Sequence, residues 1–260
     1  MSHNNNPHFE NSPILLKGEK VSKLFGGLVA VKEVDFHILQ GEIVGLIGPN
    51  GAGKTTLFNL IGGLFHPSTG AIRFEGADIT ALKPVQICHK GIARTYQIVR
   101  PFLKMNCLEN VLIGIIGRPQ REKSKKKEEE EASEFLRFVG LGGKERVMSA
   151  DLTLIDKKRL EMARALACGP RLLLLDEVMA GLNPTEINQA LELVEIIRGQ
   201  FKITLFWIEH VMGAIMKASN RIIVLDQGQK IMEGSPERVV ADPRVIEAYL
   251  GENHAYGKGN

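Results

Sequence analysis

Nine residues, Gly48 to Thr56, constrain the fold of this chain more than any other segment. They read GPNGAGKTT and match the pattern G-x-x-x-x-G-K-[ST]. The short apolar run EIVGLIG precedes them, and a helix is predicted from Lys54 to about Leu64. Glycines let backbone N–H groups curl around an anion, and the following helix adds the positive end of its dipole. A glycine-rich turn that only joins strand to helix is the alternative, but the full motif favours a phosphate-binding loop (P-loop).

The residue types in the P-loop indicate separate tasks. Lys54 is placed to reach the β- and γ-phosphates of a nucleotide, and the Thr55 hydroxyl is placed to bind Mg²⁺. We expect the whole loop to contact the nucleotide: Gly48, Pro49, Asn50, Gly51, Ala52, Gly53, Lys54, Thr55 and Thr56.

Two adjacent acids, Asp176 and Glu177, follow a run of four leucines. Carboxylates at the end of a buried apolar strand are costly unless they meet a cation or take part in a reaction. Asp176 suits direct or water-mediated Mg²⁺ binding, and Glu177 suits polarising a water for attack on a γ-phosphate. An ordinary strand end with solvated acids is the alternative, which the P-loop in the same chain disfavours.

Short apolar runs and helical patterns alternate along most of the chain. LVAVKEVDFHI has a period of two, and the continuously apolar EIVGLIG is typical of a strand buried on both faces. Further predicted strands are AIRFEGADI, RLLLLDE, ITLFWIEH and RIIVLDQG, and further predicted helices are PTEINQALELVEIIRGQ, VMGAIMKAS and DPRVIEAYLGE. This alternation predicts an α/β fold, a P-loop core with a mostly parallel sheet flanked by helices.

The middle of the chain, from about Leu82 to Ala150, has a different sequence pattern. It is mostly helical, so we expect a helical subdomain, about 98–165, inserted in one domain that spans 13–252. The polar segments 1–12 and 253–260 are expected to be flexible tails. A Lys/Glu block at 121–131 is interpreted as a solvated helix end or loop, with a contact to a partner or lipid headgroups as the alternative.

Composition excludes several classes of protein. Of the 260 residues, 44% are apolar and 24% charged, as in soluble globular proteins, and a net charge of +3 is too small to indicate nucleic-acid binding. The three cysteines form no CxxC pair, which favours reduced thiols over a disulfide framework or zinc site. We find no apolar run near the ~18 residues that span a bilayer, and no signal-peptide pattern at the N-terminus.

With the P-loop and the acid pair on either side of a helical middle, residues 14–252 resemble the ATP-binding subunit of an ABC transporter. Further matches are Phe25 in KLFGG, Gln97 in ARTYQIVRPF, Ala180–Asn183 (AGLN) and His210 in WIEH. The resemblance implies that the nucleotide is ATP, that the chain hydrolyses it with Mg²⁺, and that an antiparallel β portion lies near the N-terminus.

The resemblance also implies a role for each matching side chain. Phe25 would stack on adenine, Gln97 would touch Mg²⁺ or the attacking water, and His210 would contact the γ-phosphate. The predicted catalytic residues are Glu177, His210 and Gln97, and the predicted Mg²⁺ residues are Thr55, Gln97 and Asp176. The alternatives are a core phenylalanine, a surface glutamine and a structural histidine.

Longer stretches, among them AGLNPTE and GSPERVVADPRVIEAYLGE, look like the branched-chain amino-acid type of importer ATPase. Such a subunit would power uptake of branched-chain amino acids or a related small solute. It would be peripheral on the cytoplasmic face of the inner membrane. Its partners would be a second ATPase chain, in a heterodimer or a homodimer, membrane permease subunits and, indirectly, a solute-binding protein.

One motif departs from the family pattern. The family signature is Leu-Ser-Gly-Gly-Gln, and the residues aligned with it are Leu152, Thr153, Leu154, Ile155 and Asp156. Ile155 adds bulk where a glycine approaches the nucleotide, and it resists positive φ. Asp156 brings a negative charge unless Lys157, Lys158 or Arg159 offsets it. Thr153 keeps a hydroxyl that can bind phosphate or cap the helix.

Two consequences follow from this degenerate signature. In the family, a signature segment serves the partner's nucleotide, so we expect the site built on this chain's own P-loop to hydrolyse ATP and the other to turn over poorly. A second departure is Val178 in place of the usual proline, with a small expected effect on loop rigidity. Three other functions stay open: a non-transport ABC protein, a regulatory or assembly subunit without turnover, and a P-loop kinase.

Overall fold

A computed structural model describes residues 12–97, 99–120 and 124–255. The two expected tails fall mostly outside these ranges, as does the start of the Lys/Glu block at 121–123. Residues 253–255, placed in the C-terminal tail by the sequence, belong to the last helix of the structure.

The N-terminal part forms a four-stranded antiparallel sheet, which confirms the expected antiparallel portion. Its order is β2-β1-β4-β5, with the bounds β1 Ile14–Phe25, β2 Leu28–Leu39, β4 Thr69–Phe74 and β5 Ala77–Asp78. Phe25 pairs with Leu28 across Gly26 and Gly27, so a two-residue hairpin turn joins β1 to β2. The sequence predicted one continuous strand over 71–79, but Glu75 (φ 50°) and Gly76 (φ 76°) turn the chain there.

A second sheet of six strands is the centre of the molecule. Its order is β10-β9-β3-β8-β7-β6, with the bounds β3 Ile43–Ile47, β6 Ile92–Arg94, β7 Leu172–Asp176, β8 Thr204–Ile208, β9 Arg221–Asp226 and β10 Gln229–Gly234. Only the β9–β10 pair is antiparallel. The predicted mostly parallel sheet is therefore confirmed, while β6 and β10 are strands that the sequence analysis did not identify.

Both faces of this sheet are buried, because successive side chains of a strand point to opposite sides. In β3, Ile43 and Ile47 belong to one hydrophobic core, whereas Val44 and Leu46 belong to the other. All five residues of β3, β7 and β8 are buried, which explains their unbroken apolar sequences. The carboxyl ends of the parallel strands meet at one edge, where ligands bind in open α/β sheets.

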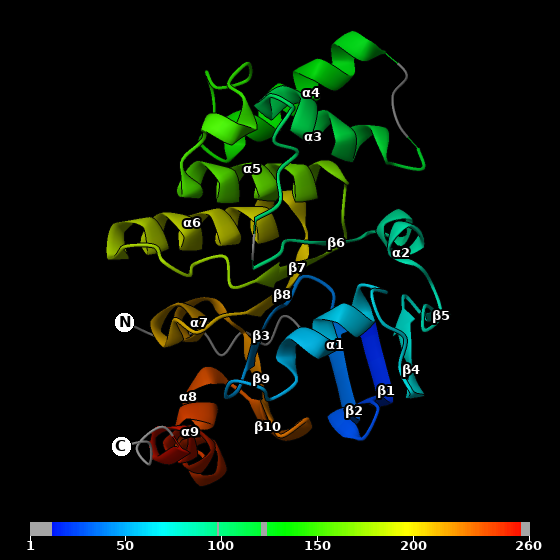
Figure 1. Cartoon of the computed structure of the whole chain (residues 1–260), viewed down its shortest axis with the longest axis vertical. Helices are drawn as coiled ribbons and strands as arrows, with labels where there is room; N and C mark the ends of the chain where they lie inside the picture. The colour runs from blue at the N-terminus through cyan, green and yellow to red at the C-terminus, as the bar shows by residue number, and fades with distance from the viewer. Residues whose placement is uncertain (1–11, 98, 121–123, 256–260) are drawn as a thin grey trace.

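The helices divide into two groups (Figure 1). Those around the sheets are α1 Lys54–Ile61, α2 Pro84–Lys90, α6 Pro184–Phe201, α7 Met212–Ala218, α8 Pro236–Ala241 and α9 Pro243–Ala255. The inserted group is α3 Cys107–Ile116, α4 Lys125–Phe138 and α5 Leu154–Ala167, and these three pack on one another beyond α6. In the described ranges, every helix is too short or too polar to cross a bilayer.

Part of the Lys/Glu block forms the first turns of α4. Lys125 and Lys126 are about nine-tenths exposed, and they lie 3.8 and 3.9 Å from Glu129 and Glu130. Such i,i+4 pairs on a solvated face support the helix by about 0.3–0.5 kcal/mol each. The first lysines of the block are therefore solvated, whereas Glu128 is buried and Glu131 pairs with Arg118.

Candidate functional site

The P-loop joins β3 to α1 and is shaped by its glycines. Gly51 and Gly53 have φ of 78° and 98°, and α1 begins directly after Gly53, at Lys54. A Cβ atom at Gly53 would collide with the Ala30 carbonyl oxygen, and one at Gly48 would collide with that of Leu225. Only glycine fits these positions, since both the backbone angle and the surrounding backbone exclude a side chain.

Lys54 spans the inside of the P-loop. Its side chain is buried, and Nζ donates to the carbonyl oxygens of Gly48 at 2.6 Å and Pro49 at 2.8 Å. Thr55 is exposed beside it. The ammonium group thus sits within a glycine-shaped cradle at a helix N-terminus, which is an arrangement suited to a polyphosphate.

Tyr249 in α9 holds the first residue of the P-loop, a contact that the sequence analysis missed. The backbone N–H of Gly48 donates to the Tyr249 hydroxyl at 2.9 Å. The two residues lie 201 positions apart, so no local pattern could have revealed the bond.

Asp176, at the end of β7, is 2% exposed and forms an ion pair with Arg94 at the end of β6. Oδ2 lies 2.6 Å from Nη2 of Arg94, while Nη1 of Arg94 donates to Asn59 in α1 at 2.6 Å. Burial raises the pKa of Asp176, and the guanidinium of Arg94 opposes that rise. No pattern in the sequence indicated this role of Arg94.

The second carboxylate oxygen of Asp176 is relevant to the predicted Mg²⁺ site. Oδ1 is buried and has no hydrogen-bond partner among the residues that the structure describes. A buried orphaned carboxylate oxygen is costly unless a ligand or water completes it. Mg²⁺ prefers oxygen ligands and keeps several waters, so Asp176 fits a magnesium site.

Glu177 is the meeting point of the three predicted catalytic residues. Its Oε2 accepts a hydrogen bond from Nε2 of Gln97 at 2.6 Å, and its Oε1 lies 2.9 Å from Nε2 of His210. Glu177 has a φ of 50°, in the left-handed region that non-glycine residues rarely adopt. Its N–H donates to the Ile208 carbonyl at 2.9 Å, which holds this conformation. Strained backbone of this kind concentrates at functional sites.

The loop after Glu177 is held from two sides. The N–H of Met179 donates to Oε1 of Glu209 at 2.8 Å, and burial raises the pKa of Glu209 to about 7. From α5, Nζ of Lys158 donates to the carbonyl oxygens of Val178 at 3.2 Å and Ala180 at 2.5 Å. Burial lowers the pKa of Lys158. From its place in the sequence, Lys158 was expected only as one of three cations that could offset Asp156.

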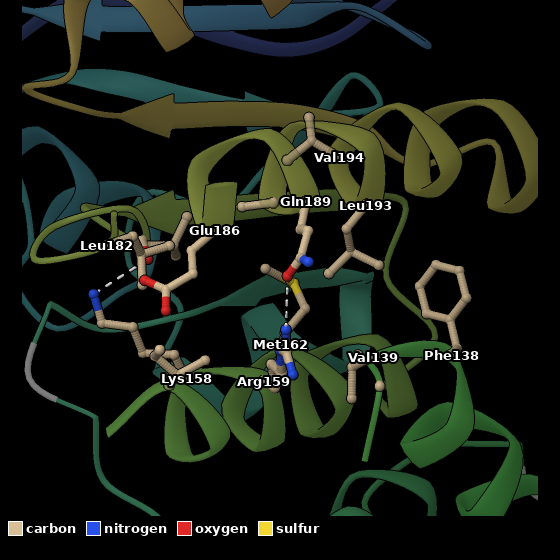
Figure 2. Close-up of a pocket in the computed structure, with 14 residues that line it drawn as sticks. Phe138, Val139, Lys158, Arg159, Met162, Leu182, Glu186, Gln189, Leu193 and Val194 are labelled. Atoms are coloured by element: carbon tan, nitrogen blue, oxygen red, sulfur yellow. Dashed lines mark hydrogen bonds between the residues drawn. The ribbon is translucent and has the colours of Figure 1, made fainter. Parts of the chain in front are cut away.

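Lys158 also lines a pocket of about 330 Å³ between α5 and α6. Figure 2 shows Lys158 and Arg159 reaching from α5, and Gln189 from α6, with Phe138 at the far end. Nη2 of Arg159 donates to Oε1 of Gln189 at 3.1 Å across the pocket.

Asn183, the last residue of the AGLN match, caps α6 by accepting the Glu186 N–H at 3.0 Å.

The segment aligned with the signature forms the start of α5. Thr153 is the N-cap, and its hydroxyl accepts the Asp156 N–H at 3.2 Å. Ile155 lies in the first helical turn, so the expected conflict with positive φ does not arise there. Leu154 is 59% exposed.

A residue that the sequence analysis did not consider neutralises Asp156. Nζ of Lys144 lies 2.6 Å from Oδ2, whereas the nearest nitrogen of Arg159 is 4.0 Å from Oδ1. Lys157 instead donates to the Ala150 carbonyl at 3.0 Å. Of the three cations that the sequence offered, Arg159 forms an ion pair with Asp156, whereas Lys157 and Lys158 donate to backbone carbonyls.

Phe25 lies on the surface at the end of β1. Its side chain is 40% exposed and meets Phe65 edge-on, with ring centroids 5.2 Å apart. Nζ of Lys23 lies 5.1 Å from the Phe25 ring centroid. The ring is not part of the core, so it is accessible for stacking on a planar ligand.

Comparisons with known proteins identify the family of this chain. Residues 31–180 match the family model described as ABC transporter, and residues 229–255 match the model described as branched-chain amino acid ATP-binding cassette transporter. The high-affinity branched-chain amino acid transport ATP-binding protein BraF of Pseudomonas aeruginosa is 37% identical over 92% of this chain and 98% of its own. The corresponding protein LivG of Escherichia coli is 38% identical over 88% and 94%.

Solved structures show the same fold. A nucleotide-free ATP-binding cassette from an ABC transporter has a TM-score of 0.83 and 30% identity, covering 91% of this chain and 99% of its own. The ADP conformation of MJ1267, an ATP-binding cassette of an ABC transporter, also has a TM-score of 0.83 and 30% identity, covering 92% and 100%. This chain therefore belongs to the ABC transporter family, as an ATP-binding protein of the LivG and BraF type with an ATPase domain.

Proposed function

We propose that this chain is one of two ATPase subunits of an importer for branched-chain amino acids or a related small solute. It would dock on permease subunits at the cytoplasmic face of the cell membrane, and a solute-binding protein would deliver the solute. The relatives named for branched-chain amino acid transport support the solute class. The observation that carries the ATPase role is the convergence of Gln97 and His210 on Glu177.

The chemistry follows from these contacts. Glu177 is positioned to polarise a water, and its two carboxylate oxygens are oriented by Gln97 and His210, so its lone pairs are directed rather than free to rotate. The Lys54 ammonium and the P-loop N–H groups stabilise charge on the phosphates. Nζ of Lys54 lies within the loop, where it donates to the Gly48 carbonyl oxygen.

Three residues would hold Mg²⁺: Thr55, Asp176 and Gln97. Bound Mg²⁺ supplies positive charge against the β- and γ-phosphates. Gln97 donates to Glu177 through Nε2, so its amide oxygen remains for the metal. Asp176 offers Oδ1, the buried oxygen without a protein partner in the described residues.

We further propose a head-to-tail heterodimer with unequal sites. The site that joins this chain's P-loop to the partner's signature would hydrolyse ATP, since the residues of this chain around Glu177 are complete. The site that joins the partner's P-loop to residues 152–156 would bind ATP and turn over slowly. Ile155 brings a side chain where the family has a glycine, which keeps the backbone from a close approach to phosphate.

Site-directed variants of the co-expressed pair test the asymmetry. Glu177→Gln should abolish ATPase activity of the complex and retain ATP binding, whereas the equivalent change in the partner should leave at least half of the activity. The opposite pattern contradicts the proposal. A homodimer of this chain should turn over slowly, because both of its sites contain residues 152–156.

The ATPase role and the solute are tested separately. A complex that binds ATP but shows no turnover with a wild-type partner, permease and solute-binding protein would make this chain a regulatory subunit. Uptake of radiolabelled leucine by proteoliposomes, competed by isoleucine and valine, tests the solute class. Uptake that none of the three competes contradicts it.

A further inference from the structure

Two of the three cysteines meet outside the site described above. Cys88 lies in α2, and Cys168 is the residue that ends α5. Both are half-buried, so small molecules can reach them, and each thiol is close enough to the other to shift its pKa. Sγ of Cys168 also donates to the Arg164 carbonyl at 3.5 Å. Cys107, in contrast, is fully buried at the start of α3.

The backbone topology brings the two thiols together. α2 leads into β6 and α5 leads into β7, and these parallel strands pair with Ile92 opposite Leu172. Cys88 and Cys168 each stand four residues before one of the paired residues. The ends of α2 and α5 therefore lead into the same end of the β6–β7 pair.

Hydrogen bonds from Arg171 connect the residue before β7 to the end of α2. Its backbone N–H donates to the Gly91 carbonyl at 2.8 Å, and its Nη2 donates to the Lys90 carbonyl at 2.8 Å. The end of α2 is thus tied to the segment that follows Cys168. The contact between the thiols is held by backbone on both sides and does not depend on a mobile loop.

The surroundings assign different roles to the two thiols. The neighbouring Cys168 thiol lowers the pKa of Cys88 to about 7 against the effect of burial, and nearby His89 also lowers it. The neighbouring Cys88 thiol and burial raise the pKa of Cys168, and Arg118 and Arg164 oppose that rise. A thiol with a lowered pKa beside a second thiol is the arrangement of a nucleophile and its resolving partner.

We propose that Cys88 and Cys168 form a redox pair that a hydroperoxide converts to an intramolecular disulfide. The Cys88 thiolate attacks one peroxide oxygen, the O–O bond breaks, and Cys88 becomes a sulfenic acid while hydroxide leaves. Sγ of Cys168 then attacks Sγ of Cys88, the S–O bond breaks, and the thiol proton leaves with the hydroxyl as water. One peroxide is reduced and two thiols are oxidised, and a dithiol reductant reverses the change.

This disulfide would join two segments that lead to the nucleotide site. β6, which follows α2, runs directly into Thr95, Tyr96 and Gln97, and the other end of α5 carries residues 152–156. The pair is thus a modification site at the junction between the sheet and the inserted helices.

Mass spectrometry of the purified full chain tests the pair. Stoichiometric hydrogen peroxide followed by alkylation in denaturant should remove two alkylatable thiols, lower the mass by about 2 Da, and leave Cys107 alkylated. Peptide mapping should show a Cys88–Cys168 link, and dithiothreitol should restore three thiols. Absence of this link, a link through Cys107, or disulfides only between chains overturns the proposal.

Single variants separate the roles. Cys88→Ser and Cys168→Ser should each abolish the intramolecular disulfide, and in Cys168→Ser a sulfenic acid at Cys88 should be trapped by dimedone. The matched control Cys107→Ser should oxidise like wild type. Disulfide formation that survives either of the first two variants contradicts the assignment.

A second measurement needs no variant and therefore no assumption about folding. In the native wild-type chain at neutral pH, iodoacetamide should alkylate Cys88 at least about 10-fold faster than Cys107, because only thiolates react. Equal rates for the two residues overturn the proposed role of Cys88.

Discussion

Lys144 and Asp156 form an ion pair, with Nζ 2.6 Å from Oδ2, that ties the loop before α5 to the first turn of α5. The carboxylate of Asp156 is 10% exposed, and the lysine that pairs with it lies outside α5. Asp156 therefore helps to fix the start of α5, and Lys144 offsets its charge. Residues 152–156 form a helix start that Thr153 caps.

Removal of Lys144 should destabilise the protein. Lys144→Met leaves Asp156 without its closest cation, and we expect a loss of about 1–3 kcal/mol in the free energy of unfolding. Urea denaturation measures the loss. Lys125→Met, on the exposed face of α4, is the matched control and should change stability by less than about 0.5 kcal/mol. In an Asp156→Asn background the Lys144→Met effect should shrink, and an undiminished effect would show that the pair is not its cause.

The contacts of Lys158 predict a role in positioning the loop after Glu177. Lys158→Met releases the carbonyls of Val178 and Ala180, so we expect kcat of the reconstituted complex to fall by about 10-fold or more with KM little changed. Lys158→Arg should restore part of kcat, because it keeps a cationic donor. Lys157→Met is the matched control, since Lys157 contacts the Ala150 carbonyl and not this loop. Equal losses in both methionine variants would refute the positioning role.

Tyr249 should support the P-loop from α9. Tyr249→Phe removes one hydrogen bond to the Gly48 N–H and keeps the ring, so stability should fall by about 1 kcal/mol and ATP should bind more weakly. Binding of a fluorescent ATP analogue measures the second effect. The control is Tyr96→Phe, because within the described residues the Tyr96 hydroxyl makes no hydrogen bond. A Tyr249→Phe protein with unchanged affinity would mean that the P-loop does not need this support.

The raised pKa of Glu161 predicts that the stability of the protein depends on pH. It is 3% exposed, and burial raises its pKa from 4.5 to about 7 against the opposing effect of Arg164 and of the Tyr96 N–H. Between these two pH values the folded chain binds more protons than the unfolded chain, so stability falls as pH rises from 4.5 to 7. Glu161→Gln removes this dependence, and its advantage over wild type should grow across that window by up to about 3 kcal/mol and stay constant above it.

Urea denaturation at pH 5 and pH 8 checks this prediction. Glu134→Gln, on a side chain that is 71% exposed, controls for the loss of a carboxylate. Burial also raises the pKa of Glu209 to about 7, so Glu209 contributes to the pH dependence in the same direction. Glu209 is present in both wild type and Glu161→Gln. Parallel pH profiles for wild type and Glu161→Gln would show that Glu161 does not cause the dependence.

The sequence by itself was sufficient for the local elements of the site. The P-loop was predictable because its glycines and Lys54 act through backbone geometry within nine residues. The strand before Asp176 was predictable because burial on both faces demands an unbroken apolar run. The short strand β6 was missed, since three residues inside a helical segment carry no periodicity and pair only with β7.

Tertiary structure alone decided which side chains meet. Gln97 and His210 reach Glu177 from loops 80 and 33 positions away, because parallel strands end at one edge of the sheet. Lys144 is the closest cation to Asp156, ahead of Arg159 on α5, and the lysines that follow Asp156 donate to backbone carbonyls. Spacing in the sequence determines turns and helix starts through local backbone geometry. The partner of a buried charge depends on which segments the packing brings within hydrogen-bond distance.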